Sequence, residues 1–298
     1  MRFLTFTAAA VLTWNGAQGF VAPSIQSRPT FTSIPHSTQL SPATPSTLSS
    51  FTSSSLKSIQ SDEFEGGGFL EKINVPYLAF YAAFLTFAFT LAPGEVNSAS
   101  DTALINELLS NPLHPDTNHL WFTIWNYFAV VPLSLAALLL PGAKKSSALG
   151  LPPSPFIAGA GALGFFSLGP LMITRKAATD VSKSEDCGFF TRNVFESKPF
   201  AVILTLLAFS VPFTSGLASD FIAGEDFSCL VNGFVDLASS SRFVTVATSD
   251  LIVMSAISAS LIPEDRERRG MDPTLPIYAL LPGIGPCIHI FLRDELPE

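Results

Sequence analysis

Asp250 is the residue of this 298-residue chain whose type and position most strongly suggest chemistry. It lies near the middle of the apolar segment 242–262. An unpaired carboxylate inside a membrane is energetically costly, so an ionisable residue at such a position is first interpreted as part of a functional site. Its chemistry would be that of a proton relay, a substrate contact or an acid/base catalyst. The alternative is a structural hydrogen bond between helices, with Asn126 or His289 as the partner.

Three other polar side chains of apolar segments are candidate ligand contacts. His289 and Arg293 stand four residues apart, so they share one face of a predicted helix. They would contact a lipid head group, a metal or a pigment such as chlorophyll or carotenoid, or else anchor the helix at the membrane surface. Asn126 lies one turn into another segment. The candidate ligand-binding set is therefore Asn126, Asp250, His289 and Arg293, with Asp250 as the one catalytic candidate.

The remaining motifs predict neither a metal site nor a soluble enzyme. His114 and His119 flank Asp116, but loop histidines next to prolines are usually solvated. The chain contains no phosphate-binding loop, nucleophile elbow, HExxH motif or haem-attachment motif. The sequence therefore favours a non-enzymatic role over catalysis, and no cofactor is identified beyond a pigment or a lipid.

The elements that would position these residues are long apolar helices. The chain is 48% hydrophobic and only 13% charged, whereas soluble domains carry about 25% charged residues. A helix needs about 20 apolar residues to cross a bilayer. These numbers predict an all-α, polytopic membrane protein with about six transmembrane helices, namely 76–92, 120–140, 155–174, 199–218, 242–262 and 275–292.

A degenerate repeat relates the two halves of this region. A shift of 122 residues places Gly94 on Gly216, Trp121 on Phe243 and Pro141 on Pro263. Two three-helix units of a membrane protein usually have opposite orientations, as in transporters, and this is the arrangement expected here. The distribution of Lys and Arg favours an alternative, in which segments 155–174 and 275–292 re-enter the membrane and all basic loops share one side.

Two polar or aromatic groups are interpreted as surface features. The turn at 265–270 carries Asp265, Arg268 and Arg269 and is predicted to be solvated, with contacts to lipid head groups. Trp121 and Trp125 are predicted to form part of an aromatic belt at the membrane surface.

The N-terminal region is predicted to be a targeting sequence that is not part of the folded domain. Residues 1–19 have the basic start, short apolar run and small cleavage-site residues of a signal peptide. Segment 20–68 begins with Phe20, and residues 21–61 include 19 Ser or Thr and no acid, which is typical of a transit peptide. This combination resembles the bipartite presequence of algae with complex plastids. It implies a multi-pass plastid (chloroplast) membrane protein whose helical membrane domain spans 69–298; a disordered secreted N-terminus is the alternative.

The helical region itself resembles two families. The motifs that carry the first likeness are Asn111-Pro112-Leu113, the Trp-rich segment after it, Gly169-Pro170, Arg242-Phe243, Asp250, Arg268-Arg269-Gly270, Gly285-Pro286, Arg293 and Leu296-Pro297-Glu298. They resemble a family of cyanobacterial and plastid integral membrane proteins that has no assigned biochemical role. The C-terminal half is also faintly similar to the neoxanthin-synthase-like plastid family, although Thr245 stands where a histidine five residues before Asp250 would be expected.

Three functions remain open at this point. The favoured one is a non-enzymatic role in the assembly or organisation of pigment–protein complexes, with membrane lipid, pigments or photosynthetic complexes as partners and no nucleic acid. The second is a carotenoid-modifying enzyme of the neoxanthin-synthase type, as the second resemblance implies, with Asp250 as the acid/base. The third is a proton-coupled carrier of a small molecule.

Overall fold

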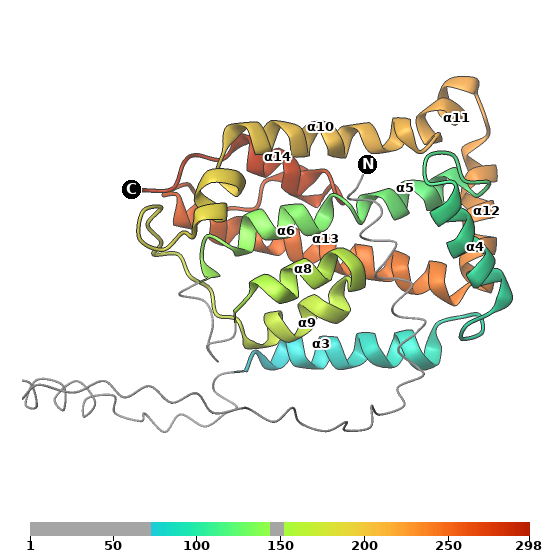
Figure 1. Cartoon of the computed structure of the whole chain (residues 1–298), viewed down its shortest axis with the longest axis horizontal. Coiled ribbons are helices and arrows are strands. Elements are labelled where there is room, and N and C mark those ends of the chain that lie inside the picture. Colours follow the sequence, from blue (N-terminus) through green and yellow to red (C-terminus); the bar gives the residue numbers. More distant parts are fainter. Residues whose placement is uncertain (1–72, 144–151) are drawn as a thin grey trace, which may run out of the picture.

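The computed structural model describes residues 73–143 and 152–298, which are helical and contain no strand, so the all-α prediction is confirmed for them (Figure 1). The predicted leader segments, 1–19 and 20–68, lie outside the described residues. The elements are α3 (Val75–Thr86), η3 (Phe87–Leu91), α4 (Ala99–Ser110), α5 (His119–Tyr127), α6 (Val131–Leu139), α8 (Ser154–Leu163), α9 (Phe165–Thr174), η4 (Thr191–Phe195), α10 (Lys198–Thr214), α11 (Leu217–Ala223), α12 (Phe227–Ser240), α13 (Arg242–Arg268), η5 (Ile277–Leu280) and α14 (Gly285–Leu292).

Most of the long helices begin at a short polar side chain that caps them. Asn118 accepts a hydrogen bond from the Trp121 amide at the start of α5, and Ser241 accepts one from the Val244 amide at the start of α13. Ser197 caps α10 in the same way and is followed by a proline in the first turn, where a missing N–H costs nothing. The first residues of these helices are therefore fixed by the local sequence.

Fewer helices can cross a membrane than the six predicted. Two are long and apolar enough, His119–Leu139 and Arg242–Arg268, and α10 with α11 makes a third if the pair, bent by 52°, is one span. The first apolar segment is a 17-residue helix, Val75–Leu91, just below this length. The segments 155–174 and 275–292 are not single spans, because a glycine interrupts each of them.

Segment 155–174 folds back on itself at Gly164. This residue has φ +56° and ψ −134°, a conformation that only glycine adopts readily. Ser167 Oγ after the break donates to the Phe156 carbonyl before it at 3.0 Å. In one continuous helix these residues would lie about 16 Å apart along the axis. Helices α8 and α9 are therefore the two arms of a short hairpin (Figure 1).

Segment 275–292 reverses in the same manner near Gly283. The short helix η5 precedes this glycine, whose φ is +71°, and α14 follows it. A Cβ placed on Gly285 would overlap the carbonyl oxygen of Tyr278, which shows how closely the returning chain passes. The two hairpins correspond to the re-entrant alternative considered for these segments, and their glycines are the physical reason that neither forms a full span.

Each hairpin brings the chain back to the end of the bundle from which it entered. The two halves of the molecule therefore begin at the same end and run in the same direction. Helix α3 begins where α9 ends, since the Asn74 amide donates to the Ile173 carbonyl at 2.7 Å. Helix α10 begins where α14 ends, since Lys198 Nζ donates to the Arg293 carbonyl at 3.1 Å. Both halves thus start and finish at one end of the bundle, which we call the arginine end. The predicted opposite orientation of the halves is wrong, because each contains one hairpin in place of a third crossing.

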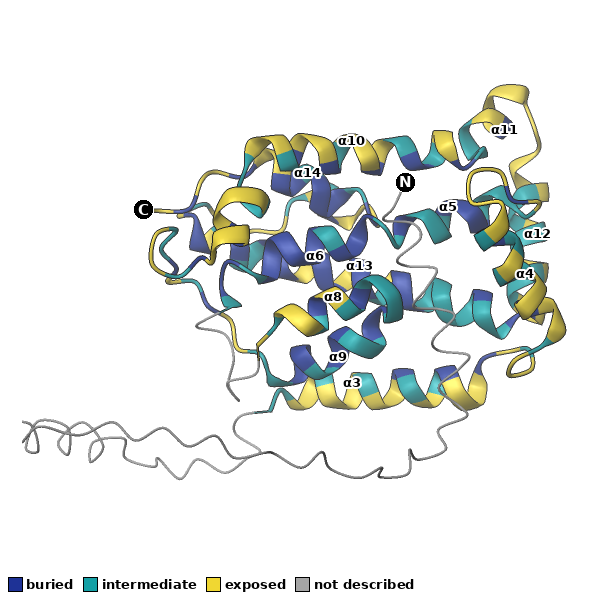
Figure 2. Ribbon diagram, in the orientation of Figure 1, coloured by how far each residue is buried: buried dark blue, intermediate teal, exposed yellow. Residues whose placement is uncertain are grey.

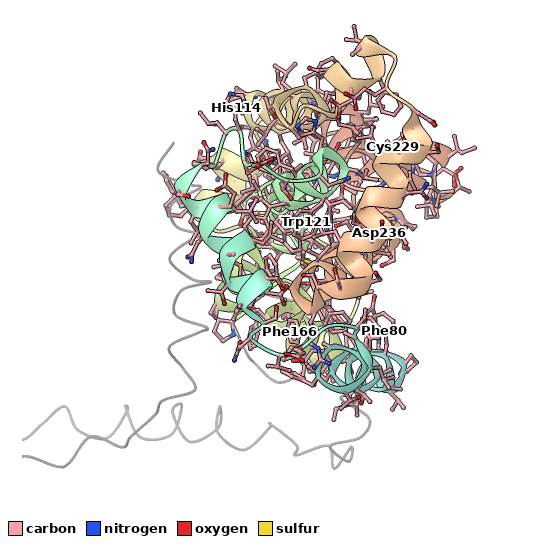
Figure 3. The ribbon with its side chains drawn as sticks, turned by 90° about the vertical axis from the view of Figure 1, so that its right-hand side faces the viewer. Phe80, His114, Trp121, Phe166, Cys229 and Asp236 are labelled. Carbon is pink, nitrogen blue, oxygen red and sulfur yellow. The ribbon has the colours of Figure 1, made fainter. Side chains whose placement is uncertain are left out.

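The other end carries α4, α11 and α12, and we call it the acidic end (Figures 1 and 3). Its segments, 93–118 and 215–241, contain eight Asp or Glu residues and no Lys or Arg. Asn118 Nδ2 donates to the Leu230 carbonyl at 3.0 Å and joins the two segments. Figure 3 views this end and shows Asp236 and Cys229 on the outer helix α12, with Trp121 in the interior.

Contacts between the halves are reciprocal at the acidic end. Asp101 of the first half accepts a hydrogen bond from Ser241 Oγ at the start of α13, at 2.5 Å. Asp220 of the second half lies 2.7 Å from His119 Nδ1 at the start of α5. A shift of 122 residues places His119 on Ser241 and, within three residues, Asp101 on Asp220. Each half therefore holds the start of the other half's long helix with an aspartate.

The outer helices present large apolar side chains to the surroundings. On α10, Ile203, Leu206 and Phe213 are each at least 65% exposed, and on the α3–η3 helix Phe89 and Leu91 are 55% and 71% exposed. Helix α6, by contrast, is almost wholly buried in the interior (Figure 2). Soluble monomers rarely expose contiguous apolar patches of this kind. Two opposite faces of the bundle are thus apolar on the outside.

Candidate functional site

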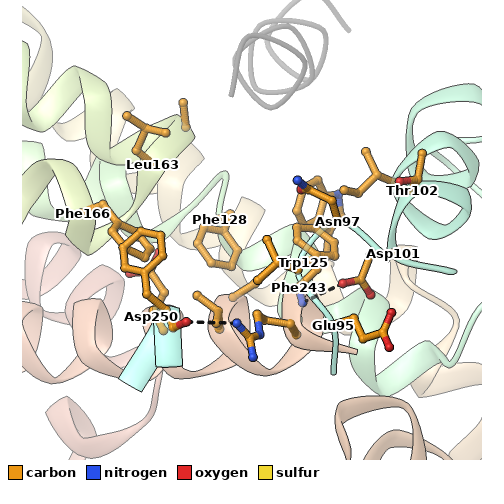
Figure 4. A pocket seen from close by; sticks show the side chains of 18 of the residues that line it. Glu95, Asn97, Asp101, Thr102, Trp125, Phe128, Leu163, Phe166, Phe243 and Asp250 are labelled. Atoms are coloured by element: carbon orange, nitrogen blue, oxygen red, sulfur yellow. Dashed lines mark hydrogen bonds between the residues drawn. The ribbon is translucent and has the colours of Figure 1, made fainter. Parts of the chain in front are cut away.

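A cavity of about 230 Å³ lies between the first half of the chain and α13 (Figure 4). Its walls come from η3, α4, α5, the α8–α9 hairpin and the first three turns of α13. The lining residues are Ala88, Phe89, Glu95, Val96, Asn97, Asp101, Thr102, Ile105, Trp125, Phe128, Gly161, Ala162, Leu163, Phe166, Arg242, Phe243, Val246, Ala247 and Asp250. Phe89 and Val96 are more than half exposed, so the cavity reaches the surface between η3 and α4.

Asp250 lies in the wall of this cavity and is only 5% exposed. Its Oδ1 accepts a hydrogen bond from the Phe165 amide at 2.6 Å. Phe165 opens α9, and the residue before it, Gly164, has no side chain to cap that helix. Asp250 supplies the cap from another helix and places a negative charge at the positive end of α9. Its Oδ2 accepts no hydrogen bond from the described residues, which leaves this oxygen available to a molecule in the cavity.

Gly164 is required where it stands for a second reason. A Cβ on this residue would overlap the Asp250 carboxylate. The break in segment 155–174 and the position of the carboxylate therefore depend on each other. A related arrangement occurs in the other half, where a Cβ on Gly283 would lie 2.6 Å from the ring of Tyr127. Each long central helix thus presents a side chain to the glycine break of the opposite hairpin.

The polar mouth of the cavity is held together by Arg242 and Asp101. The Arg242 guanidinium donates to the carbonyl oxygens of Phe89, Ala92 and Gly94 at 2.9 to 3.1 Å. Asp101 accepts hydrogen bonds from Ser241 Oγ and, as Figure 4 shows, from the Phe243 amide. The arginine donates to backbone groups and, among the described residues, forms no ion pair with a carboxylate of the cavity.

A second group of ionisable residues lies at the arginine end, and we call it the arginine cluster. Its members are Arg175, Glu196, Glu264, Asp265, Arg268, Arg269, His289 and Arg293. Asp265 is fully buried at its centre: Arg269 Nε lies 3.0 Å and His289 Nε2 2.9 Å from its Oδ2. Glu196 forms two parallel hydrogen bonds with Arg269, each 2.9 Å, the strong bidentate geometry.

The cluster joins five chain segments through carbonyl groups as well as ion pairs. Arg268 Nη1 donates to the Leu138 carbonyl and Arg293 Nη1 to the Ala137 carbonyl, both at 3.1 Å and both at the end of α6. Arg175 pairs with Glu264. Burial lowers the pKa of Arg269, but the charge of Asp265 and the hydrogen bonds with Glu196 outweigh burial and hold this pKa above its ordinary value. The charges are paired and buried, which is the arrangement of a structural joint.

The structure separates the four candidate ligand contacts. His289 and Arg293 lie together in the arginine cluster, whereas Asp250 lies in the cavity wall. Asn126 donates to the Phe122 carbonyl of its own helix at 2.9 Å and does not line the cavity. The alternative of a hydrogen bond from Asp250 to Asn126 or His289 is not realised, because Asn126 donates to Phe122 and His289 contacts Asp265.

Two predictions about surface features are wrong. The 265–270 turn is largely part of α13 and its end, and Asp265, Arg268 and Arg269 are each at most 8% exposed, because carbonyls and carboxylates of neighbouring segments surround them. Trp121 has no exposed surface and packs on Phe243 with ring centroids 5.7 Å apart. Trp125 lines the cavity. These aromatic rings belong to the interior contact between the halves, not to a surface belt.

Sequence reasoning also missed Glu196, Glu264 and Gly164. Glu196 lies in loop-like sequence with nothing nearby to mark it, and Glu264 belongs to the charged stretch that was predicted to be solvated. A signal for Gly164 existed, since it is the glycine nearest the middle of segment 155–174 and is followed by two phenylalanines. The chain matches no protein-family model, no curated protein and no solved structure.

Proposed function

We propose that this protein is a plastid integral membrane protein that binds one end of a lipid-soluble molecule, a pigment or a lipid, in the cavity beside Asp250. Its role is to hold that molecule for the assembly or organisation of pigment–protein complexes, without chemical turnover. The observation that carries the proposal is the aromatic cavity in which one oxygen of a buried carboxylate accepts no hydrogen bond from the residues that the structure describes. We further propose that the two halves are copies of one ancestral unit.

Membrane insertion is supported by the exposed apolar faces of α3 and α10 together with the two or three helices of spanning length. In this arrangement Asp250, the ninth of the 27 residues of α13, lies about 12 Å in from the start of that helix, so the cavity lies on the acidic side of the bundle's middle. The acid-free, hydroxyl-rich N-terminal region supports plastid import. Lys and Arg are concentrated at the arginine end. By the positive-inside tendency the arginine end stays on the side from which the helices insert, and the acidic end lies on the opposite side of the membrane.

Binding of a partly enclosed molecule is supported by the size and the walls of the cavity. Pockets that enclose a whole drug-sized ligand measure about 300–1,000 Å³, and this one measures about 230 Å³. It therefore suits one end of a longer molecule. The exposed side chains of Phe89 and Leu91 beside its mouth give the remainder of that molecule an apolar path along the bundle.

An enzyme that acts on such a molecule is the second candidate. The observation that favours it is again the Asp250 carboxylate, because a buried acid in an apolar pocket is suited to proton transfer. The faint likeness to neoxanthin-synthase-like proteins points the same way. A carrier has less support, because the halves run in the same direction and the arginine cluster closes the end of the bundle beyond Asp250.

Mass spectrometry of molecules that co-purify with the protein in mild detergent tests the proposal. We expect a pigment or lipid in near-stoichiometric amount with the unmodified protein and with a Glu267→Gln control at the distant arginine end. Gly161→Phe should remove it, because Gly161 lines the cavity and has open space beside it. Absence of any such molecule, or equal retention by Gly161→Phe, would refute binding in this cavity. Retention of a chemically different molecule by Asp250→Asn would favour the enzyme.

A further inference from the structure

The cavity contains more negative charge than its own cation can balance. Its ionisable lining residues are Glu95, Asp101, Asp250 and Arg242. The Arg242 guanidinium is bound to three carbonyl oxygens, and Asp101 is held by Ser241 and the Phe243 amide. Asp250 has one N–H donor for its two oxygens. The described residues give none of these carboxylates an ion pair, so Glu95, Asp101 and Asp250 line the cavity or its mouth without a cationic partner among those residues.

A neutral ligand would leave this imbalance in place. A hydroxyl group donates one hydrogen bond to a carboxylate but brings no charge, so in an apolar site the carboxylate either stays costly or takes up a proton. A cationic group supplies both a donor or close contact and the missing charge. The acidic end around the cavity mouth adds to the attraction for cations, because its two segments contain eight carboxylates and no Lys or Arg.

The aromatic walls of the cavity also favour a cationic ligand over a neutral one. Trp125, Phe128, Phe166 and Phe243 line the cavity together with Phe89. Trp125 packs against Phe243 edge-on and against Phe128 at a tilt, with centroid distances of 5.7 and 6.1 Å, so three aromatic rings lie close together in the cavity wall. A cation within about 6 Å of an aromatic face is attracted by the ring, and aromatic groups beside a carboxylate are a usual means of recognising alkylammonium groups.

We infer that the cavity takes the cationic head of an amphiphile, an alkylated amine or quaternary ammonium group, whose apolar tail leaves past Phe89 along the outer face of α3. This inference rests on the proposed binding function and specifies the ligand. The ammonium group lies among Trp125, Phe128 and Phe243, with the Asp250 carboxylate as its counter-ion. The head fits the small volume and the tail contacts the apolar outer face.

The test compares two probes of the same shape that differ in charge. Benzyltrimethylammonium and its neutral carbon analogue, neopentylbenzene, are titrated calorimetrically into the purified full chain in an uncharged maltoside detergent. We expect the cation to bind at least tenfold more tightly than the neutral probe. Asp250→Asn should abolish this preference, and Trp125→Leu, which keeps the carboxylate, should weaken binding of the cation more than that of the neutral probe. Glu267→Gln serves as the control and should leave both affinities unchanged.

Three results would overturn the inference. The neutral probe could bind as tightly as the cation, the preference could persist in both cavity variants, or neither probe could bind. In the first two cases a neutral pigment or lipid that co-purifies with the chain would leave the proposed function standing. If neither probe binds and no lipid-soluble molecule co-purifies, the proposed function fails together with the inference.

Discussion

The Asp250 carboxylate accepts a hydrogen bond from the Phe165 amide at 2.6 Å, across 85 residues of sequence. This one contact joins a long central helix to the point where a shorter segment turns back. It caps α9, requires glycine at position 164 and places a carboxylate oxygen in the cavity wall. Structure and proposed function therefore depend on the same pair of residues.

Gly164→Ala should destabilise the protein strongly. The backbone at this residue has φ +56° and ψ −134°, which costs a non-glycine residue about 1–3 kcal/mol, and the added Cβ would overlap Asp250. Thermal unfolding in detergent measures the loss. Gly161→Ala is the matched control in the same hairpin: a Cβ there meets nothing within 4 Å, so its unfolding free energy should rise by about 0.5–1 kcal/mol. Equal stability of the two variants would contradict the hairpin geometry.

Asp265→Asn should be among the most damaging single changes at the arginine end. It removes the charge that faces Arg269, Arg293 and His289 in a buried site. Removal of one partner from a buried ion pair typically costs about 3–5 kcal/mol. The neighbouring Glu267 is exposed, and Glu267→Gln should change the unfolding free energy by less than about 0.5 kcal/mol. An Asp265→Asn variant that unfolds at the same temperature as this control would show that the cluster is not a structural joint.

The extent to which sequence predicted this molecule differs between its parts. The all-α class and the limits of the long helices follow from apolar segments and from caps such as Ser197 and Ser241, which are local signals. The number of spans does not, because segment 155–174 has the length and composition of a span and only the backbone of Gly164 breaks it. Asp250 was identified as the best candidate because a carboxylate in an apolar helix is rare.

The partners of these residues were beyond sequence reasoning. Asp250 contacts a backbone amide 85 positions away, which no residue type marks. The charged turn at 265–270 was predicted to be solvated because charged residues in connections usually are. It is buried because Glu196 and the carbonyls of α6 converge on it from distant segments. The internal repeat stays a prediction. The relative orientation of its halves depends on whether segments 155–174 and 275–292 cross the membrane, and the wrong span count led to the wrong orientation.

Thiol reactivity should distinguish the three cysteines. Cys229 is exposed on α12, whereas Cys187 and Cys287 are buried. Burial, with added repulsion from Glu196 and Asp186, raises the pKa of Cys187, so less of its thiol is in the reactive thiolate form at pH 8. A maleimide should therefore modify one cysteine per folded chain and three per chain in denaturant. Rapid modification of Cys187 under native conditions would contradict its burial beside the arginine cluster.

The most direct test of the account asks which connections share a side of the membrane. Chains with one exposed cysteine each are compared in sealed vesicles with an impermeant maleimide, since Cys187 and Cys287 are buried. The first has native Cys229 on α12. The other two have a Cys229→Ser background with Ser110→Cys at the end of α4 or Ser184→Cys between α9 and η4, both at exposed positions. The structure predicts that positions 110 and 229 react from one side and position 184 from the other. Six full spans would instead place 110 and 184 together, opposite 229, and that result would contradict the parallel halves and the hairpins on which the cavity depends.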